Sequence, residues 1–589
     1  MNFPTYSRLD GLNSLVTKCV HTLCVPASDA ATLPKTQSSV PSLYDFNLLT
    51  NHSTKKRGSS RELPCRLLEL YLERFHAKRN TNAINGSSSR RSLLDMHSRQ
   101  SVLDYIIRER ILVRANFVLQ LLRDGGAFHF DLWALCEINE FSPAEVEAIL
   151  QAMAPVAGAF RSLTLGGTSW IYEFTLERGP LRKLLSQAAL ATSLRSLKMQ
   201  QVSFESLFAL MHSCGRLQRL EIAQPSLQCA DIEKIASYLR MQQQQSSGDD
   251  AISEDDHLQH LNLPPICRSL RFLSLPSSVK DRGLMHLLPF FPRLTTLRCT
   301  PFEELLDTLE QSLAHRHHLQ LPTTVTAARR TVAVLADLRS LSIAHPMSVD
   351  TVDRLMAACP HLVELSIQVQ EGMSLAALAT EQTAATLRRL ALNNSPSMPL
   401  NFVEHVAPLL RSPTGRRLTS LSLEYFDHID LTTVTESCPS LRSFSAQWFS
   451  TVTVQQLADE HSRRLHRMMA SIKCSSAATS CKPFSELRHL RLRPRPHQSL
   501  SAEVVAYLLN DAADLRHIEL YCCSELTDEA ILAINQRNPL PHLQTFILRH
   551  GHSVTNGALC RLVASAAAST GSLVFHDCGL VPPVRKEEM

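Results

Sequence analysis

Residues 338–343 read Leu-Arg-Ser-Leu-Ser-Ile, and residues 362–367 read Leu-Val-Glu-Leu-Ser-Ile. Both follow the pattern apolar-x-x-apolar-x-apolar, whose last two apolar positions alternate as on one face of a β-strand. The pattern occurs thirteen times in the 589 residues, and a ragged fourteenth copy reads Leu573-x-Phe575. The thirteen copies begin at Phe160, Leu194, Leu217, Leu270, Leu294, Leu338, Leu362, Leu387, Leu418, Leu441, Leu487, Leu515 and Leu543.

The spacing between copies indicates a repeat architecture. Seven of the twelve intervals lie between 23 and 28 residues, within the period of leucine-rich repeats. Apolar residues at helical spacing follow several copies, for example Val352, Leu355 and Met356. A strand and a helix cannot bury their apolar sides alone, so neighbouring repeats must stack. We therefore predict an α/β leucine-rich-repeat solenoid, a horseshoe over residues 156–580 with strands on the concave face. The intervals of 53, 44 and 46 residues predict either insertions or degenerate repeats.

Composition shifts divide the rest of the chain. A polar linker near Asn80 precedes residues spaced for one long helix that includes Val102 to Leu122 and ends near Gly125. A second helix is expected at Ser142, which begins a capping-box pattern with Glu145. The predicted zones are a poorly ordered segment at 1–40, a candidate adaptor-binding box at 41–78, a linker and helical cap at 79–155, a disordered insertion within the solenoid at about 241–258, and a tail at 581–589.

Composition also excludes several classes of protein. The net charge of +5, from 60 Lys+Arg against 55 Asp+Glu, is too small to indicate a nucleic-acid partner. No apolar run reaches the length that spans a bilayer, and Lys18 interrupts the only apolar stretch near the start. The expected location is therefore the cytoplasm or the nucleus, where the 16 cysteines would be reduced and pack as small apolar groups.

Catalytic signatures are absent from the sequence. It contains no nucleophile elbow, no phosphate-binding glycine loop and no zinc-protease motif, and only 18 glycines. The cysteines do not form paired C-x-x-C knuckles, and the histidines of 315–318 lie in a polar stretch typical of a solvated surface. We expect neither an enzyme, nor a bound metal, nor a cofactor.

The concave face is the expected binding surface. Its outward positions are small and polar in the middle repeats, where Ser340, Ser342 and Ser422 are examples. Toward the C-terminus they become cationic and aromatic, which suits a partner segment that carries carboxylates. A strand surface in contact with water is polar in any case, so a solvated face is the alternative. The candidate groove residues are Trp448, His489, Arg491, Arg493, His517, Tyr521 and Arg549.

One copy carries a more specific resemblance. Residues 523–531, from Cys523 to Ile531, resemble the C-x-x-L-T-D-x-x-L signature of cysteine-containing leucine-rich repeats. This subclass is common in substrate-recognition subunits of ubiquitin ligases, including F-box/leucine-rich-repeat proteins. Independently of that resemblance, Cys523 suits a buried turn position, and Thr527-Asp528 suits the start of a helix.

Two short N-terminal elements resemble adaptor-binding boxes. Residues 42–49, with Leu43 and Tyr44, look like an elongin-binding BC box. Leu63-Pro64 with Leu67 and Leu68 resembles both a cullin-selecting box and the opening of an F-box. The resemblance implies short amphipathic helices that present leucines to an elongin or Skp-type adaptor, and through it to a cullin. The alternative is that these elements cap the solenoid.

The sequence therefore predicts a non-enzymatic recognition protein. The favoured role is the substrate receptor of a cullin-type E3 ubiquitin ligase, with a substrate protein on the concave face. Alternatives are a leucine-rich-repeat scaffold or regulatory module unrelated to ubiquitin, and a binder similar to ribonuclease inhibitor.

Overall fold

The structure is a computed structural model, and it describes residues between 96 and 576 with gaps. The larger gaps are 167–179, 201–206, 246–264, 315–321, 455–483 and 559–571. The chain forms two compact units. The first comprises residues 1–227 and 238–270, and the second comprises residues 228–237 and 271–589.

Two helices begin the described part of the first unit, where the sequence predicted one. They are separated near Val113, whose backbone N–H donates to the side chain of the buried residue Asn139 at 2.6 Å. This tertiary contact holds Val113 outside a helix, so the prediction of one long helix was wrong. The elements of this unit are α4 Met96–Glu109, α5 Ala115–Arg123, β1 His129–Asp131, α6 Leu132–Ile138, α7 Pro143–Met153, η1 Ala154–Ala159, β2 Ser162–Leu165, α9 Pro180–Leu185, α10 Ala188–Ser193, β3 Ser196–Met199, β4 Arg219–Ile222 and α13 Pro265–Ser269.

The first unit also contains a strand within the predicted helical cap. Strand β1 pairs in parallel with β2, which belongs to the first predicted repeat. Phe130 of β1 lies against Phe160, with their ring centroids 6.0 Å apart, and so covers the start of the repeat core. The capping box at α7 forms as predicted, since Ser142 and Glu145 bond reciprocally.

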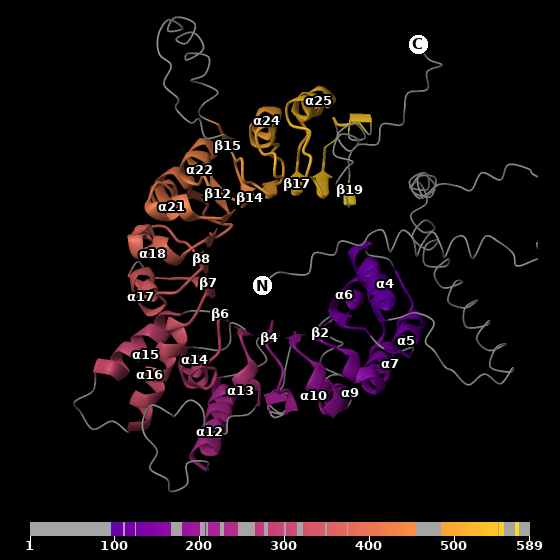
Figure 1. Ribbon diagram of the computed structural model, residues 1–589, viewed down its shortest axis with the longest axis vertical. Coiled ribbons are helices and arrows are strands. Elements are labelled where there is room, and N and C mark those ends of the chain that lie inside the picture. The colour runs from indigo at the N-terminus through magenta and orange to yellow at the C-terminus, as the bar shows by residue number, and fades with distance from the viewer. Residues whose placement is uncertain are drawn as a thin grey trace, which may run out of the picture. The chain divides into compact units, whose positions relative to one another are not determined.

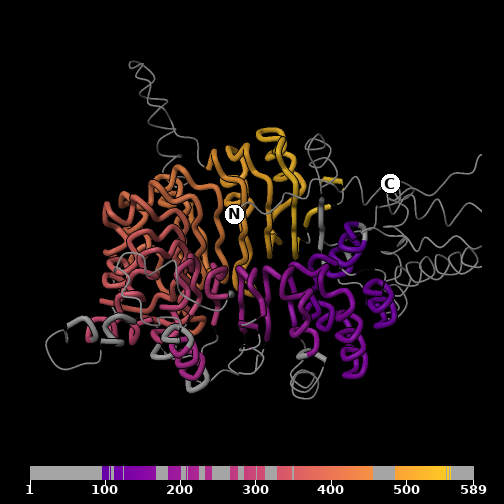
Figure 2. The backbone as a smooth tube through the Cα atoms, turned by 60° about the horizontal axis from the view of Figure 1, so that its bottom comes forward, coloured from indigo at the N-terminus to yellow at the C-terminus, as the bar shows by residue number. Residues whose placement is uncertain are grey.

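The second unit is a stack of strands with helices on its outer side (Figures 1 and 2). Its strands are β5 Phe272–Ser274, β6 Thr296–Cys299, β7 Ser340–Pro346, β8 Glu364–Gln368, β9 Arg389–Asn393, β11 Ser420–Glu424, β14 Ser443–Phe449, β16 His489–Pro494, β17 His517–Tyr521, β18 Thr545–Arg549 and β19 Ser572–His576. Its helices are α14 Asp281–Leu287, η3 Leu288–Phe290, α15 Glu303–Ala314, α16 Pro322–Ala336, α17 Thr351–Ala358, η4 Ala376–Ala379, α18 Glu381–Thr386, α19 Phe402–His405, α20 Ala407–Leu410, α21 Pro413–Arg417, α22 Leu431–Ser437, α24 Ala502–Asn510 and α25 Asp528–Arg537. Two short pairs, β10 Leu400–Asn401 with β12 Phe426–Asp427 and β13 Ile429–Asp430 with β15 Val452–Thr453, lie beyond the main strands.

Every copy of the sequence pattern becomes a strand, including the ragged copy at Leu573. Within each unit, successive strands are parallel and in register, so that Leu365 of the second unit pairs with Leu341 on one side and Leu390 on the other. These three leucines are almost completely buried, with exposed fractions of 2% or less. One apolar row thus runs from strand to strand, as an α/β leucine-rich-repeat solenoid requires.

The long intervals between copies contain insertions wherever the structure describes them. Strand β6 pairs directly with β7, although helices α15 and α16 lie between them in sequence. Strand β14 likewise pairs directly with β16. The interval of 53 residues, between the copies at Leu217 and Leu270, contains helix α12 (Cys229–Gln245). This helix continues through residues 241–245, so the first residues of the predicted disordered insertion are helical. The rest of that insertion lies outside the described residues.

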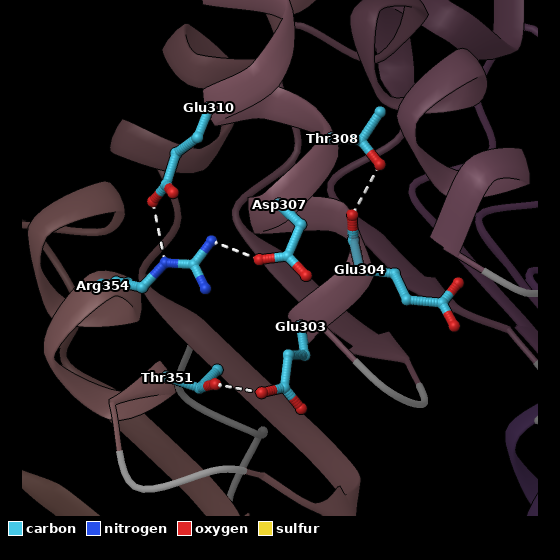
Figure 3. Close-up of polar contacts among 7 residues, drawn as sticks. All are labelled: Glu303, Glu304, Asp307, Thr308, Glu310, Thr351 and Arg354. Carbon is cyan, nitrogen blue, oxygen red and sulfur yellow. Dashed lines mark hydrogen bonds and ion pairs between the residues drawn. The ribbon is translucent and has the colours of Figure 1, made fainter.

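Helix α15 is attached to the next repeat through polar contacts (Figure 3). Arg354 of α17 binds two carboxylates of α15, with Nε 2.8 Å from Glu310 and Nη2 2.8 Å from Asp307. Thr351 donates to Glu303 at 2.9 Å. The contact with Glu310, followed by that with Asp307, raises the pKa of Arg354, so the guanidinium remains charged.

The leucine row gives a direct test of the register. Leu365→Ala and Leu421→Ala should each lower the free energy of unfolding by roughly 2–5 kcal/mol, because each removes a fully buried side chain. The matched controls are Ser366→Ala and Ser422→Ala, which alter the residue directly after each leucine, on the opposite face of the strand. They should change the free energy of unfolding by less than about 0.5 kcal/mol. Chemical denaturation followed by circular dichroism measures both. Equal effects for leucine and serine variants would contradict the register.

Candidate functional site

The predicted groove residues lie on four neighbouring strands, β14, β16, β17 and β18. Parallel pairing places Gln447 beside Arg493, Arg491 beside Glu519, and Tyr521 beside Arg549. Since adjacent strands are about 4.8 Å apart, residues separated by a hundred positions in sequence meet on one surface. We call Trp448, Arg491, Arg493, Tyr521 and Arg549 the arginine–aromatic cluster.

Arg493 lies at the centre of the arginine–aromatic cluster. Its guanidinium carbon is 4.0 Å from the centroid of the Trp448 ring and 5.1 Å from that of Tyr521. Arg549 lies over the same tyrosine at 5.2 Å. Both distances for Arg493 are within the range of cation–π attraction, which orients the guanidinium before any partner binds. No carboxylate pairs with Arg493 or Arg549 in the part of the chain that the structure describes.

Arg491 and Tyr521 share an internal carboxylate. Nε of Arg491 is 3.2 Å from Glu519, and the Tyr521 hydroxyl donates to the other oxygen of the same group. Burial, followed by this hydrogen bond, raises the pKa of Tyr521, so the hydroxyl stays protonated. The cluster therefore combines three guanidinium groups with one carboxylate, and keeps an excess of positive charge.

A β-bulge presents Trp448. The pairing of β14 with β16 shifts between Gln447 and Phe449, which leaves Trp448 as the extra residue with φ of 57°. Bulges commonly redirect a side chain in this way. Arg495 donates to the Trp448 carbonyl at 3.1 Å and lies 3.4 Å from Asp427, so the bulge is braced from the next repeat.

Tyr425 extends the aromatic surface and was missed by the sequence analysis. Its ring stacks on Trp448, with centroids 6.2 Å apart and planes inclined by 7°. Both residues lie seven positions after the start of their repeats, and both have positive φ. Cys522 and His550 share that offset and that conformation. A comparison of residues at equal offsets would have indicated Tyr425.

His489 and His517 lie outside the arginine–aromatic cluster. They face each other at the beginning of β16 and β17, with ring centroids 4.6 Å apart and planes inclined by 9°. Partial burial lowers the pKa of both, and for His489 the neighbouring His517, Arg516 and Arg488 lower it further. The pair is therefore mostly neutral at pH 7, whereas the sequence predicted cationic side chains at these positions.

The middle of the concave face is small and polar, as the sequence indicated. Ser342 pairs in register with Ser366, and Ser422 pairs with Ser445. Each is partly exposed between buried neighbours. The bulky side chains of the arginine–aromatic cluster thus begin beside a surface of serines.

The cysteine-containing repeat forms as its residues suggested. Thr527 caps α25 by accepting from the Ala530 N–H, and Cys523 is fully buried. Among the cysteines whose side chains the structure describes, eight are free thiols, and all of these but Cys522 are buried. Burial raises the pKa of Cys359 and Cys438 to about 12, so these thiols stay protonated.

Three further predictions concern the adaptor-binding box, metal ions and membrane spans. The described residues do not include the candidate adaptor-binding residues, which are Leu43, Tyr44, Leu63, Pro64, Leu67 and Leu68. Within the described residues, no group of three or more histidine, cysteine and acidic side chains is arranged to hold a metal ion. No helix in that part of the chain is both long and apolar enough to cross a membrane.

Comparisons with known proteins found distant structural likeness. No protein-family model and no curated protein sequence matches the chain. Among solved structures, the yeast Rad7–Elc1 complex matches with 16% identity over 74% of this chain and 88% of that chain, at a TM-score of 0.40. The leucine-rich-repeat-containing protein LegL7 from Legionella pneumophila matches with 15% identity over 52% and 86%, at a TM-score of 0.29. The TLR13–ssRNA13 complex matches with 12% identity over 74% and 62%, at a TM-score of 0.25.

The histidine pair should make stability depend on pH. Its pKa values are lower in the folded chain, so the unfolded chain binds protons first as the pH falls below about 6.5. The neutral pair should therefore not reduce the free energy of unfolding above that pH. Below it, the free energy of unfolding should decrease progressively as the pH falls. Denaturation of wild type and of His489→Gln/His517→Gln between about pH 7.5 and 5 measures the difference. Parallel curves for the two proteins would contradict the assignment.

Proposed function

We propose that the chain is a protein-recognition subunit that holds a carboxylate-bearing segment of its partner on the arginine–aromatic cluster. The observation that carries the proposal is Arg493, which lies between the rings of Trp448 and Tyr521 and has no carboxylate partner in the described residues. A guanidinium held this way loses little conformational freedom on binding. Its donors remain able to bind a carboxylate bidentately.

Several properties of the surface support a protein partner. Arginine, tryptophan and tyrosine are the residues that dominate the energetic centres of protein interfaces. Glu519 already neutralises Arg491 at 3.2 Å, so the excess charge of the cluster belongs to Arg493 and Arg549. The adjoining serines leave space for a main chain to approach β11 and β14. A partner segment could therefore lie across the strands with its acidic side chain at Arg493.

The finer proposal is that this partner is the substrate of a cullin-type E3 ubiquitin ligase. It rests on the sequence of residues 41–72, which resembles adaptor-binding boxes, and on the cysteine-containing repeat at Cys523. In that role the chain would hold the substrate near enzymes that transfer ubiquitin and would perform no chemistry itself. The competing proposal is a scaffold with the same groove and no adaptor.

Charge reversal tests the groove. Arg491→Glu/Arg493→Glu should weaken binding of groove partners by at least about 2 kcal/mol, or about thirtyfold. The reason is that an arginine that attracts the partner's carboxylate is replaced by a carboxylate that repels it. Quantitative affinity purification and mass spectrometry from cells should show a specific set of proteins lost. Folding, followed by thermal denaturation, should change little because both side chains are partly exposed.

A matched variant separates the groove from a general charge effect. Arg329→Glu/Arg416→Glu changes the net charge equally at exposed positions on the outer helices α16 and α21. It should retain the wild-type partners. Identical partner lists for wild type and both variants would refute the groove proposal.

The adaptor proposal has a separate test. Leu43→Ser/Leu67→Ser/Leu68→Ser should abolish co-purification of an elongin or Skp-type adaptor, because it removes the apolar anchors of the predicted boxes. Leu9→Ser/Leu12→Ser/Leu33→Ser is the control, with equal loss of leucines in the segment before the boxes. Unfolding of the repeats by the first variant alone would favour a capping role, and an unchanged adaptor signal would exclude the box.

A further inference from the structure

A carboxylate without a cationic partner lies on the concave face of the second unit. The main strands of this unit carry three glutamates in the part of the chain that the structure describes. Glu364 pairs with Arg389 at 3.6 Å, on the adjacent strand. Glu519 pairs with Arg491 at 3.2 Å, also on the adjacent strand. Glu424, the last residue of β11, has no ion pair within the described residues and therefore keeps its negative charge.

Gln447 separates Glu424 from Arg493. It lies on β14, in register with Glu424 on one side and with Arg493 on the other. Its Nε2 donates to the Glu424 carboxylate at 3.0 Å and to the Ser445 hydroxyl at 3.5 Å. Because an amide is neutral, it orients the carboxylate without cancelling its charge. One negative and one positive group thus lie two strands apart, and each is held by a neighbouring side chain.

Both charged side chains face the groove. Glu424 follows the buried Leu423 in the alternation of β11, and Arg493 follows the buried Leu492 in that of β16. Each is partly exposed. The hydrogen bond from Gln447 to Glu424 confirms this placement, because it joins side chains of adjacent strands on the same face. A partner in the groove therefore meets a carboxylate as well as guanidinium groups.

The separation of the two charges suits a partner segment in the polyproline II conformation. Adjacent strands are about 4.8 Å apart, so the backbones at Glu424 and Arg493 are roughly 10 Å apart. A polyproline II segment has about three residues per turn and rises about 3.1 Å per residue, so residues i and i+3 lie on the same side roughly 9 Å apart. In a β-strand the same two residues point to opposite sides. The small side chains of Ser422 and Ser445, which pair in register beside this row, leave room for the main chain.

Charges of both signs on one surface also restrict the kind of partner. A uniformly acidic segment would bring a second carboxylate against Glu424, and like charges across an interface disfavour binding. The same carboxylate repels a nucleic-acid backbone or an anionic membrane, which are negative along their whole length. A segment with one acidic and one basic side chain satisfies both ends. The charge pattern therefore favours a protein partner of mixed charge.

We infer that Glu424 determines the specificity of the groove by binding a basic side chain three residues away from the acidic side chain that Arg493 holds, in a partner segment of polyproline II conformation. This inference rests on the proposed function, because the acidic side chain must be bound at Arg493. It adds a sequence requirement for the partner, namely an acidic residue and a lysine or arginine separated by two other residues.

Selection from random peptides tests this requirement. Phage-displayed random dodecapeptides are panned against the full-length chain and against its Glu424→Gln, Arg493→Gln and Glu364→Gln variants. Wild type should enrich peptides that have an acidic and a basic residue three positions apart. Glu424→Gln should keep the acidic residue and lose the basic one, whereas Arg493→Gln should lose the acidic one. Glu364→Gln is the matched control, because Glu364 already pairs with Arg389, and it should select the same peptides as wild type.

A charge swap protects the test against misfolding. Glu424→Lys should replace the basic residue of the selected peptides by a second acidic one, a change that an unfolded chain cannot produce. One peptide selected by wild type, with its basic residue kept or replaced by glutamine, is then titrated by calorimetry. The basic residue should strengthen binding to wild type by about fivefold and binding to Glu424→Gln by less than about twofold.

The outcomes separate this inference from the proposed function. Enrichment of acidic residues without a basic residue three positions away, or a basic preference that Glu424→Gln leaves unchanged, overturns the inference alone. A basic preference about seven positions away, which is the spacing of an α-helix over that distance, also overturns it. If wild type enriches no acidic residue, both the inference and the groove proposal are wrong.

Discussion

The whole arrangement depends on one constraint, the in-register parallel pairing of buried apolar residues from each repeat to the next. Leu365 can be fully buried only because Leu341 and Leu390 lie on either side of it. The same register fixes the polar residues between them, since a shift by one position would reverse the two faces. The core and the groove therefore both result from the alternation of buried apolar and exposed polar residues along each strand. Insertions such as α15 and α16 must leave the pairing of the strands unchanged.

Sequence reasoning succeeded where this alternation is local. Each copy of the pattern predicted a strand, and Ser142 and Thr527 predicted caps that form. It failed where a contact from elsewhere decides the outcome. Apolar spacing favoured one helix across Val113, but the side chain of Asn139 binds that backbone N–H and interrupts it. Strand β1 was missed because a three-residue strand has too little periodicity to distinguish it from a loop.

The groove residues were partly predictable for the same reason. Offsets within the repeat place Arg491, Arg493 and Tyr521 on one face, but they do not show that Glu519 neutralises Arg491 or that Arg493 lies between two rings. Nor do they reveal that partial burial and neighbouring positive charges lower the pKa of His489 and of His517. The excess positive charge of this end of the face thus belongs to Arg493 and Arg549, whose guanidinium groups lie over aromatic rings.

The left-handed position seven residues into a repeat has a consequence for how such a chain can diversify. Tyr425, Trp448, Cys522 and His550 differ greatly in size and chemistry, yet they share this backbone conformation. For bulky residues it is sparsely populated and costs about 1–3 kcal/mol, which the surrounding repeat must sustain whatever the side chain is. These four repeats therefore provide equivalent positions at which different side chains can be displayed. Natural selection or a protein engineer can exchange the side chains there one at a time, and so change the chemistry of that surface while the leucine core stays the same.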